Sequence, residues 1–145
     1  MNLKYEEKRP TAKEYNTLME LVGWGNWSDN IIEEALDNTI YSICVYDGEK
    51  IVGYGRLIGD KTIFMYIHSF MVHPEYQGQG IGKGIIKKLL EYIDELKKVN
   101  PKIRTYLGAA KGKESFYEQF GFVARPTEDV GAGMILKETK KITGE

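Results

Sequence analysis

Cysteine and histidine are scarce in this chain of 145 residues, which contains one cysteine, Cys44, and two histidines. A single cysteine excludes a disulfide within the chain and a zinc site built on cysteines. The sequence also lacks an apolar run of the ~18 residues that a membrane-spanning helix requires. Its first ten residues lack the apolar segment of a signal peptide. We therefore expect a cytoplasmic protein that contacts no membrane and uses no metal ion.

Charge of one sign is also lacking over the chain as a whole, because 20 basic and 21 acidic residues leave a net charge of −1. One local exception runs from residue 83 to 104, where seven basic residues stand against three acidic ones. A nucleic-acid-binding face is one interpretation of this stretch, and it would bind in a strongly salt-dependent way. A solvated helix face is a second interpretation, and a basic rim near a phosphate site is a third, for Lys83, Lys87 and Lys88. The balanced net charge argues against nucleic acid, so we expect no nucleic-acid partner.

The length and the ordinary composition, with 42% apolar and 28% charged residues, fit one globular domain over residues 1–145. No internal repeat or linker is present. Residues 138–145 are polar and charged, and we expect them to form a frayed tail.

Hydrophobic periodicity predicts an α/β chain with helices between strands. Two hairpins in succession predict an antiparallel meander, and a strand that follows a long helix predicts parallel pairing by a right-handed crossover. The expected strands cover residues 3–7, 40–46, 51–58, 64–72, 103–107, 122–123 and 134–137, and the expected helices cover residues 11–22, 28–36, 80–99 and 113–120.

The most informative stretch is 64–99, which is predicted as a strand, a glycine-rich turn and an amphipathic helix. Glycine occupies every second position from Gly78 to Gly84. The first N–H groups of a helix lack intrahelical partners, and the helix dipole adds positive potential there. Glycine lets a ligand come close to the main chain. The turn therefore predicts a site for phosphate or diphosphate.

Two common phosphate motifs do not fit this turn. A P-loop needs a glycine where Gln77 stands and Ser or Thr where Gly84 stands. A dinucleotide fingerprint needs a glycine at Lys83 or at Ile85, depending on the register. The pattern Gln-x-x-Gly-x-Gly does fit, with its first residue at Gln77, and it resembles the acetyl-CoA-binding motif of the GNAT N-acetyltransferase superfamily. An ordinary strand-to-helix turn with excess glycine is the alternative.

A second segment strengthens the resemblance, because a Phe-Tyr-x-x-x-Gly-Phe pattern on a short helix, here 116–122, is typical of the same superfamily. The two segments span 64–123. The resemblance implies a mixed, mostly antiparallel sheet of six to seven strands flanked by about four helices. It also implies an N-acetyltransferase that moves the acetyl group of acetyl-CoA directly to a primary amine of a small molecule or peptide.

The resemblance assigns cofactor contacts to two groups of residues. Main-chain groups of the strand bind the pantetheine, with one N–H near a strand bulge against the thioester oxygen, and the turn with the helix start holds the diphosphate. The strand residues are Phe70, Met71 and Val72, and the turn residues are Gln77, Gly78, Gln79, Gly80, Ile81, Gly82 and Lys83. One departure is Ala110, where many relatives carry an asparagine.

Two catalytic candidates follow from the resemblance. Tyr117 is the expected general acid for the departing thiolate, and a core-packing tyrosine is the alternative. His68 is the expected base, acting through water, and a structural strand histidine is the alternative. The two-residue strand period would place His68 on the same face as Phe70 and Val72, unless a bulge intervenes. His73 is expected to be structural.

The acceptor is not identified by the sequence. Aromatic and acidic side chains of the first two helices and central strands are candidates to line its site, including Trp24, Trp27, Tyr54, Tyr66, Asp29, Glu33 and Glu34. A homodimer is left open. A different class of function is also open, in which the same fold binds acetyl-CoA or CoA as a catalytically silent sensor or regulatory module.

Overall fold

A computed structural model describes residues 1–137, and the expected tail at 138–145 lies outside the described residues. The chain divides into two compact units, residues 1–107 and 108–145. The first unit contains nine elements: β1 Leu3–Glu7, α1 Ala12–Leu21, α2 Asp29–Asp37, β2 Tyr41–Asp47, β3 Lys50–Gly59, β4 Phe64–Val72, the 3₁₀ turn η1 Pro74–Tyr76, α3 Ile81–Val99 and β5 Arg104–Leu107.

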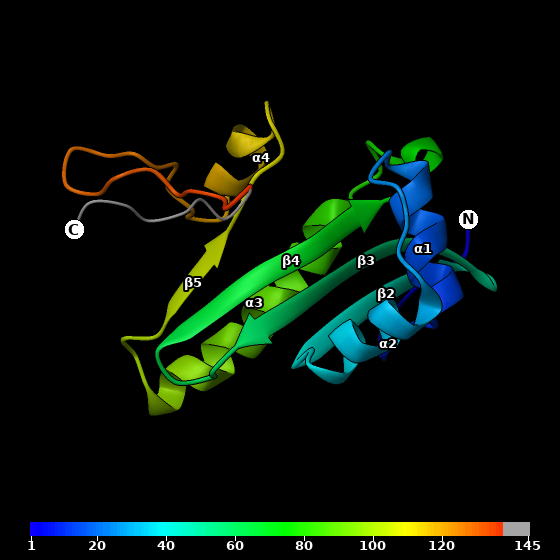
Figure 1. The fold of residues 1–145 in the computed structure, drawn as a ribbon, viewed down its shortest axis with the longest axis horizontal. Coiled ribbons are helices and arrows are strands. Elements are labelled where there is room, and N and C mark those ends of the chain that lie inside the picture. The colour runs from blue at the N-terminus through cyan, green and yellow to red at the C-terminus, as the bar shows by residue number, and fades with distance from the viewer. Residues whose placement is uncertain (138–145) are drawn as a thin grey trace, which may run out of the picture. The chain divides into compact units, whose positions relative to one another are not determined.

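The strands of the first unit form one sheet in the order β1-β2-β3-β4-β5. The first four strands pair antiparallel, while β4 and β5 pair parallel after the crossover through α3. Both the meander and the parallel pairing are therefore confirmed (Figure 1). The predicted bounds agree with the observed ones within about two residues in this unit.

Helix α3 covers one face of the sheet, and glycines in β3 allow it to lie close. A Cβ atom on Gly55 would lie 2.7 Å from Cγ2 of Ile85, and one on Gly53 would lie 3.0 Å from Ile81 and Ile85. Figure 1 shows α3 behind the strands. The apolar stripe predicted for this helix from Ile81 to Val99 is buried between Ile81 and Ile93, whereas Val99 at its end is exposed.

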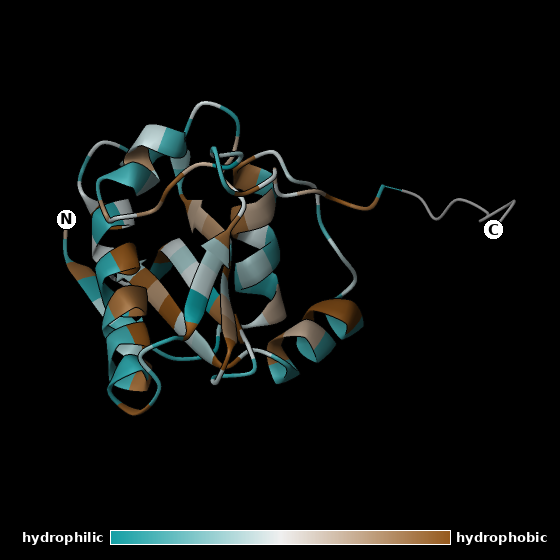
Figure 2. Ribbon diagram, turned by 90° about the vertical axis from the view of Figure 1, so that its left-hand side faces the viewer, coloured by the Kyte–Doolittle hydropathy of each residue, from teal (hydrophilic) through white to brown (hydrophobic). Residues whose placement is uncertain are grey.

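Helices α1 and α2 pack on the other face. Their buried residues, among them Tyr15, Leu18 and Leu36, form one apolar cluster with Tyr54 and Met71 from the strands. The capping box of Thr11 and Glu14 is present at the start of α1. Hydrophobic and hydrophilic residues alternate along the helices in Figure 2, as two-faced packing requires.

The second unit contains one short helix, α4 Glu114–Glu118, in the place of the predicted helix at 113–120. The two closing strands predicted at 122–123 and 134–137 are wrong, because neither segment forms a strand. The apolar side chains that suggested them are exposed, including Val123 and Met134. A strand needs a partner to satisfy its main chain, and these segments have no sheet partner among the described residues. Over residues 1–137 the sheet thus has five strands rather than six or seven.

Candidate functional site

The residues predicted to hold the diphosphate lie together on the turn between β4 and α3. Residues 77–80 are all exposed, and Gly80 is the N-cap of α3. Gly78 and Gly80 have φ angles of 80° and 81°, a left-handed conformation that favours glycine. A Cβ atom at either position would meet no other atom within 4 Å. The main chain at Gly78 and Gly80 is therefore accessible to a ligand.

The N-terminus of α3 adds positive electrostatic potential at this turn. Its first intrahelical bond runs from the amide of Gly84 to the carbonyl of Gly80, at 3.1 Å. The three preceding amides, those of residues 81–83, therefore have no acceptor within the helix. The exposed Lys83 adds charge and forms no ion pair within residues 1–137. These groups fit a diphosphate, and acetyl-CoA contains one.

Several contacts hold the turn against the sheet. His73 is buried, its amide donates to the carbonyl of Val52 at 2.8 Å, and its Nδ1 accepts from the amide of Glu75. The structural role expected for His73 is confirmed by these bonds. The hydroxyl of Tyr76 donates to Asp47 at 2.6 Å, so the mouth of α3 is fixed before any ligand arrives.

Strand β4 carries a bulge at the point where the resemblance implies one. Tyr54 lies opposite Met71, and Arg56 lies opposite His68, so that Gly55 faces both Ser69 and Phe70. Ser69 has φ 54°, which is unusual for a residue with a side chain. The strand therefore contains one additional residue relative to its partner.

The bulge changes which residues share a face of the sheet. The Phe70 ring lies on the α3 face, 3.8 Å from a Cβ atom built on Gly55. His68 lies on the opposite face, where its ring contacts Arg56, whose guanidinium also donates to a carbonyl of α2. The two-residue period would have placed His68 with Phe70, and the bulge breaks that parity.

A hydrogen-bonded cluster surrounds Ser69 on the α1–α2 face. Arg56 donates from Nε to the Ser69 hydroxyl at 3.1 Å and contacts Nδ1 of His68 through Nη2 at 3.1 Å. The Ser69 hydroxyl lies 2.9 Å from the same Nδ1 and 2.5 Å from the hydroxyl of Tyr15. Three side chains, from α1, β3 and β4, thus meet at one buried serine.

Because arginine can only donate, its contacts define the direction of the other bonds. Nδ1 of His68 accepts from Arg56 and so carries no proton. Ser69 must then donate to Nδ1, which leaves Tyr15 as the donor to Ser69. A neutral His68 ring with an unprotonated Nδ1 carries its proton on Nε2. Desolvation by burial and the nearby charge of Arg56 both lower the pKa of His68, which favours this neutral ring.

Replacing Ser69 by alanine should lower the free energy of unfolding by about 2–4 kcal/mol, because Tyr15 and Arg56 would each lose a buried partner. Ser69→Gly loses the same hydroxyl but adopts the positive φ more readily. We expect it to be about 1 kcal/mol more stable than Ser69→Ala. Urea unfolding measures both values. An alanine variant as stable as the wild type would contradict this account of the cluster.

Tyr117 belongs to the second unit, on α4. It is buried, and burial raises the pKa of its phenol. Its ring makes edge-to-face contacts with Phe116 and Phe122, at centroid distances of 5.1 Å and 6.3 Å. The hydroxyl is therefore protonated at neutral pH, as a general acid requires, and its role stays a prediction.

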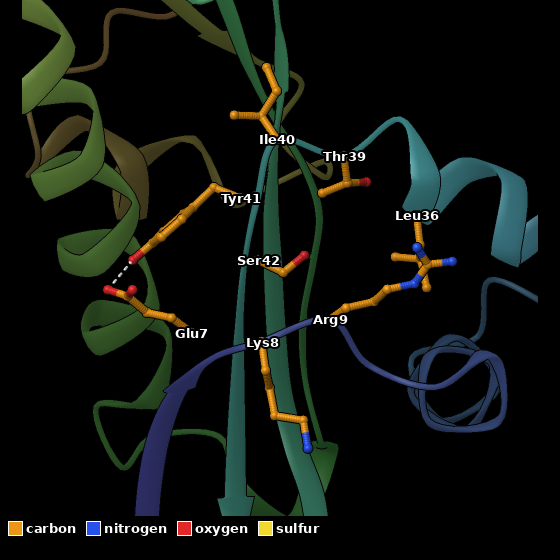
Figure 3. Close-up of a pocket in the computed structure, with 8 residues that line it drawn as sticks. All are labelled: Glu7, Lys8, Arg9, Leu36, Thr39, Ile40, Tyr41 and Ser42. Atoms are coloured by element: carbon orange, nitrogen blue, oxygen red, sulfur yellow. Dashed lines mark hydrogen bonds between the residues drawn. The ribbon is translucent and has the colours of Figure 1, made fainter.

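A cleft of about 300 Å³ opens in the first unit. Figure 3 shows Tyr41 and Glu7 hydrogen-bonded on one side of a strand, with Arg9 and Leu36 on the other side. Arg9 is paired with acidic residues of α2. None of the predicted site residues lines this cleft. It is lined by Glu7, Lys8, Arg9, Leu36, Thr39, Ile40, Tyr41 and Ser42.

Sequence reasoning missed three residues of the Ser69 cluster. A signal was present for two of them, since Arg56 interrupts an apolar central strand and Ser69 interrupts the apolar run of β4. Polar residues at such positions need buried partners. Tyr15 gave no signal, because its helical spacing fits a purely apolar role.

The whole chain was compared with known proteins. Residues 15–141 match the family model described as acetyltransferase (GNAT) domain. The chain belongs to the GNAT acetyltransferase family. A Prochlorococcus marinus relative, an uncharacterized N-acetyltransferase ycf52-like protein, is 31% identical over 117 residues, which cover 78% of this chain and 63% of that relative. An uncharacterized N-acetyltransferase ycf52 of Pyropia yezoensis is 29% identical over 78% of this chain and 65% of its own length. This GNAT chain thus spans under two thirds of both relatives.

Solved structures agree with the fold of this GNAT chain. A Staphylococcus aureus protein described as a probable acetyltransferase superposes with a TM-score of 0.82 and 28% identity, over 94% of this chain and 99% of that one. A GNAT-family acetyltransferase from Streptococcus pneumoniae gives 0.79 at 24% identity, over 95% and 99%. Within residues 1–137, no helix has the length and apolar character to cross a membrane. No three His, Cys, Asp or Glu residues gather there as a metal site.

Proposed function

We propose that the protein is an N-acetyltransferase that moves the acetyl group of acetyl-CoA directly to a primary amine of a small molecule or peptide. The open turn at Gly78 and Gly80, leading into the positive end of α3, is the observation that carries the proposal. Membership of the GNAT family supports it. A cytoplasmic location belongs to the proposal too, although one relative, GCN5-related N-acetyltransferase 2 of Arabidopsis thaliana, is named chloroplastic.

The roles proposed for the residues are those that the resemblance implies. The turn and the first turn of α3, residues 77–83, would hold the diphosphate, and the main chain of residues 70–72 would hold the pantetheine. Acetyl-CoA supplies the activated acetyl group when bound. Tyr117 would donate a proton to the departing sulfur, for which a protonated phenol is suited.

Calorimetry and a thiol-release assay test this function together. We expect acetyl-CoA to bind, and at least one amine of a broad panel to release CoA. No binding at ~1 mM would reject the cofactor site. Tight binding without release by any amine would favour the silent binding module.

His68 is tested by two variants, which distinguish the base that the resemblance implies from a hydrogen-bond donor. Its Nδ1 contacts Arg56 and Ser69, so its proton lies on Nε2, which can act as a donor. Glutamine can donate a similar bond but cannot take up a proton. We expect His68→Gln to keep turnover within about threefold of the wild type and His68→Ala to lose about tenfold, the scale of one lost hydrogen bond.

The pH profile distinguishes donor from base. Burial and Arg56 lower the pKa of His68 below its usual 6.5, so the ring stays neutral as pH falls to that value. Any loss of turnover that results from protonation of His68 should therefore begin below pH 6.5. The same loss should be absent in His68→Gln. A loss of 100-fold or more in His68→Gln at pH 8 would instead identify a base.

A further inference from the structure

Arg56 of β3 is a buried cation without a carboxylate partner. Its side chain is 9% exposed, and within residues 1–137 no acidic group forms an ion pair with it. Its hydrogen bonds go to neutral acceptors, namely Ser69, His68, Thr39 and the carbonyl of Ala35. By contrast, the exposed Arg9 pairs with two carboxylates. Buried charges are normally paired, so this exception requires an explanation.

The guanidinium retains a donor on the side that faces His68. Arginine has five N–H groups. One on Nε and two on Nη1 are used by Ser69, Thr39 and Ala35, and one on Nη2 is used by His68. The second N–H of Nη2 has no acceptor in this set. His68 beside it is exposed, so a ligand can approach this end of the cluster.

The groups around His68 and Nη2 of Arg56 indicate which kind of ligand could bind there. His68 presents an Nε2–H donor, and Tyr66 lies beside it with its ring centroid 6.1 Å away. Two donors backed by a fixed positive charge attract an oxyanion. An acceptor with a second ammonium group, such as a polyamine, would be repelled here. Glu33, one of the carboxylates expected to attract a cation, is paired with Arg9.

We propose that Arg56 and His68, oriented by Ser69, bind an oxyanion of the acceptor, a carboxylate or a phosphate, so that the acceptor is an amine that also carries an acidic group. This inference rests on the proposed N-acetyltransferase function and specifies its substrate class. The bulge at Ser69 places this site on the α1–α2 face of β4, and the Phe70 ring on the α3 face.

Matched acceptor pairs test the inference in the thiol-release assay. Glycine with glycinamide, β-alanine with its amide, and phosphoethanolamine with ethanolamine each differ by the acidic group, and rates are corrected for the fraction of neutral amine. We expect at least one pair to show about a 10-fold or greater advantage in kcat/KM for the acidic member, expressed in KM. Comparison of the carboxylate pairs with the phosphate pair shows which of the two oxyanions the site prefers. Equal kcat/KM within every pair would overturn the inference.

Variants of Arg56 connect the preference to the cluster. Arg56→Gln should abolish the advantage of the acidic member while leaving the KM for acetyl-CoA unchanged, and Arg56→Lys should recover part of it. Arg104→Gln is the matched control, because Arg104 is an exposed arginine at the start of β5. It should leave kcat/KM unchanged for both members of each pair. An equal loss for both members in a folded Arg56→Gln protein would contradict the inference.

A binding measurement on the wild type covers the case in which Arg56→Gln does not fold. The chain has only two histidines, so their ring signals in NMR spectra are easily assigned. Titration with acetate or inorganic phosphate should shift His68 and leave the buried His73 unchanged. Absence of a shift at His68 would overturn the inference. A shift at His68 without turnover of any amine would reject the proposed function and retain the anion site.

Discussion

Replacing Tyr117 by phenylalanine is expected to lower kcat about 100-fold and to change the Kd for CoA less than twofold. A positioned general acid contributes typically 10²–10⁴-fold, and phenylalanine removes only the hydroxyl. The ring that contacts Phe116 and Phe122 stays in place. Because burial raises the pKa of Tyr117, the wild-type phenol is protonated across the neutral range and can serve as the donor.

Tyr92→Phe is the matched control for Tyr117. Tyr92 lies on α3, where its ring packs against Tyr41, and loss of its hydroxyl should leave kcat unchanged. Steady-state thiol release and calorimetry give the two quantities. If Tyr117→Phe turns over as fast as the wild type, the hydroxyl is not the acid and Tyr117 serves packing alone.

Replacing Gly80 by alanine should weaken CoA binding by about 10-fold or more. Gly80 has φ 81°, and a Cβ atom there would enter open space beside the first amides of α3. That space is where we place the diphosphate, so the methyl group would keep the phosphates away from the main chain. Calorimetry with CoA measures the loss.

Gly25→Ala controls for the strain that the same change introduces. Gly25 also has a left-handed φ of 80° and open space around a built Cβ atom. It lies in the loop between α1 and α2. Both variants should lose about 1–2 kcal/mol of stability, but only Gly80→Ala should lose affinity. Equal CoA affinity in the two variants would move the diphosphate away from this turn.

The sequence predicted the first unit well, because its signals are local. The bounds of β4 agree with the prediction at both ends. The Thr11–Glu14 capping box marks the start of α1, and glycines mark the start of α3. The glycine-rich turn before α3 was likewise predictable, since all of its residues fall within seven positions of the chain.

Features that depend on distant partners were not predictable. The apolar segments at 122–123 and 134–137 have strand propensity, but a strand forms only where another strand supplies hydrogen bonds. The bulge at Ser69 depends on the register of β4 against β3, which no local pattern specifies. The cluster around Arg56 combines residues of α1, α2 and β4, which are distant in the sequence. Its composition is therefore visible only in the folded structure.

The extra residue at Ser69 has an evolutionary consequence. The bulge places the side chains of His68 and Phe70 on opposite faces of β4, although the two residues are only two positions apart. On the proposed function, mutations at His68 can change the acceptor preference while the main chain of residues 70–72 keeps its contacts with the acyl donor. A selection experiment confined to Tyr66, His68 and Arg56 offers a direct route to new acceptor preferences in this scaffold.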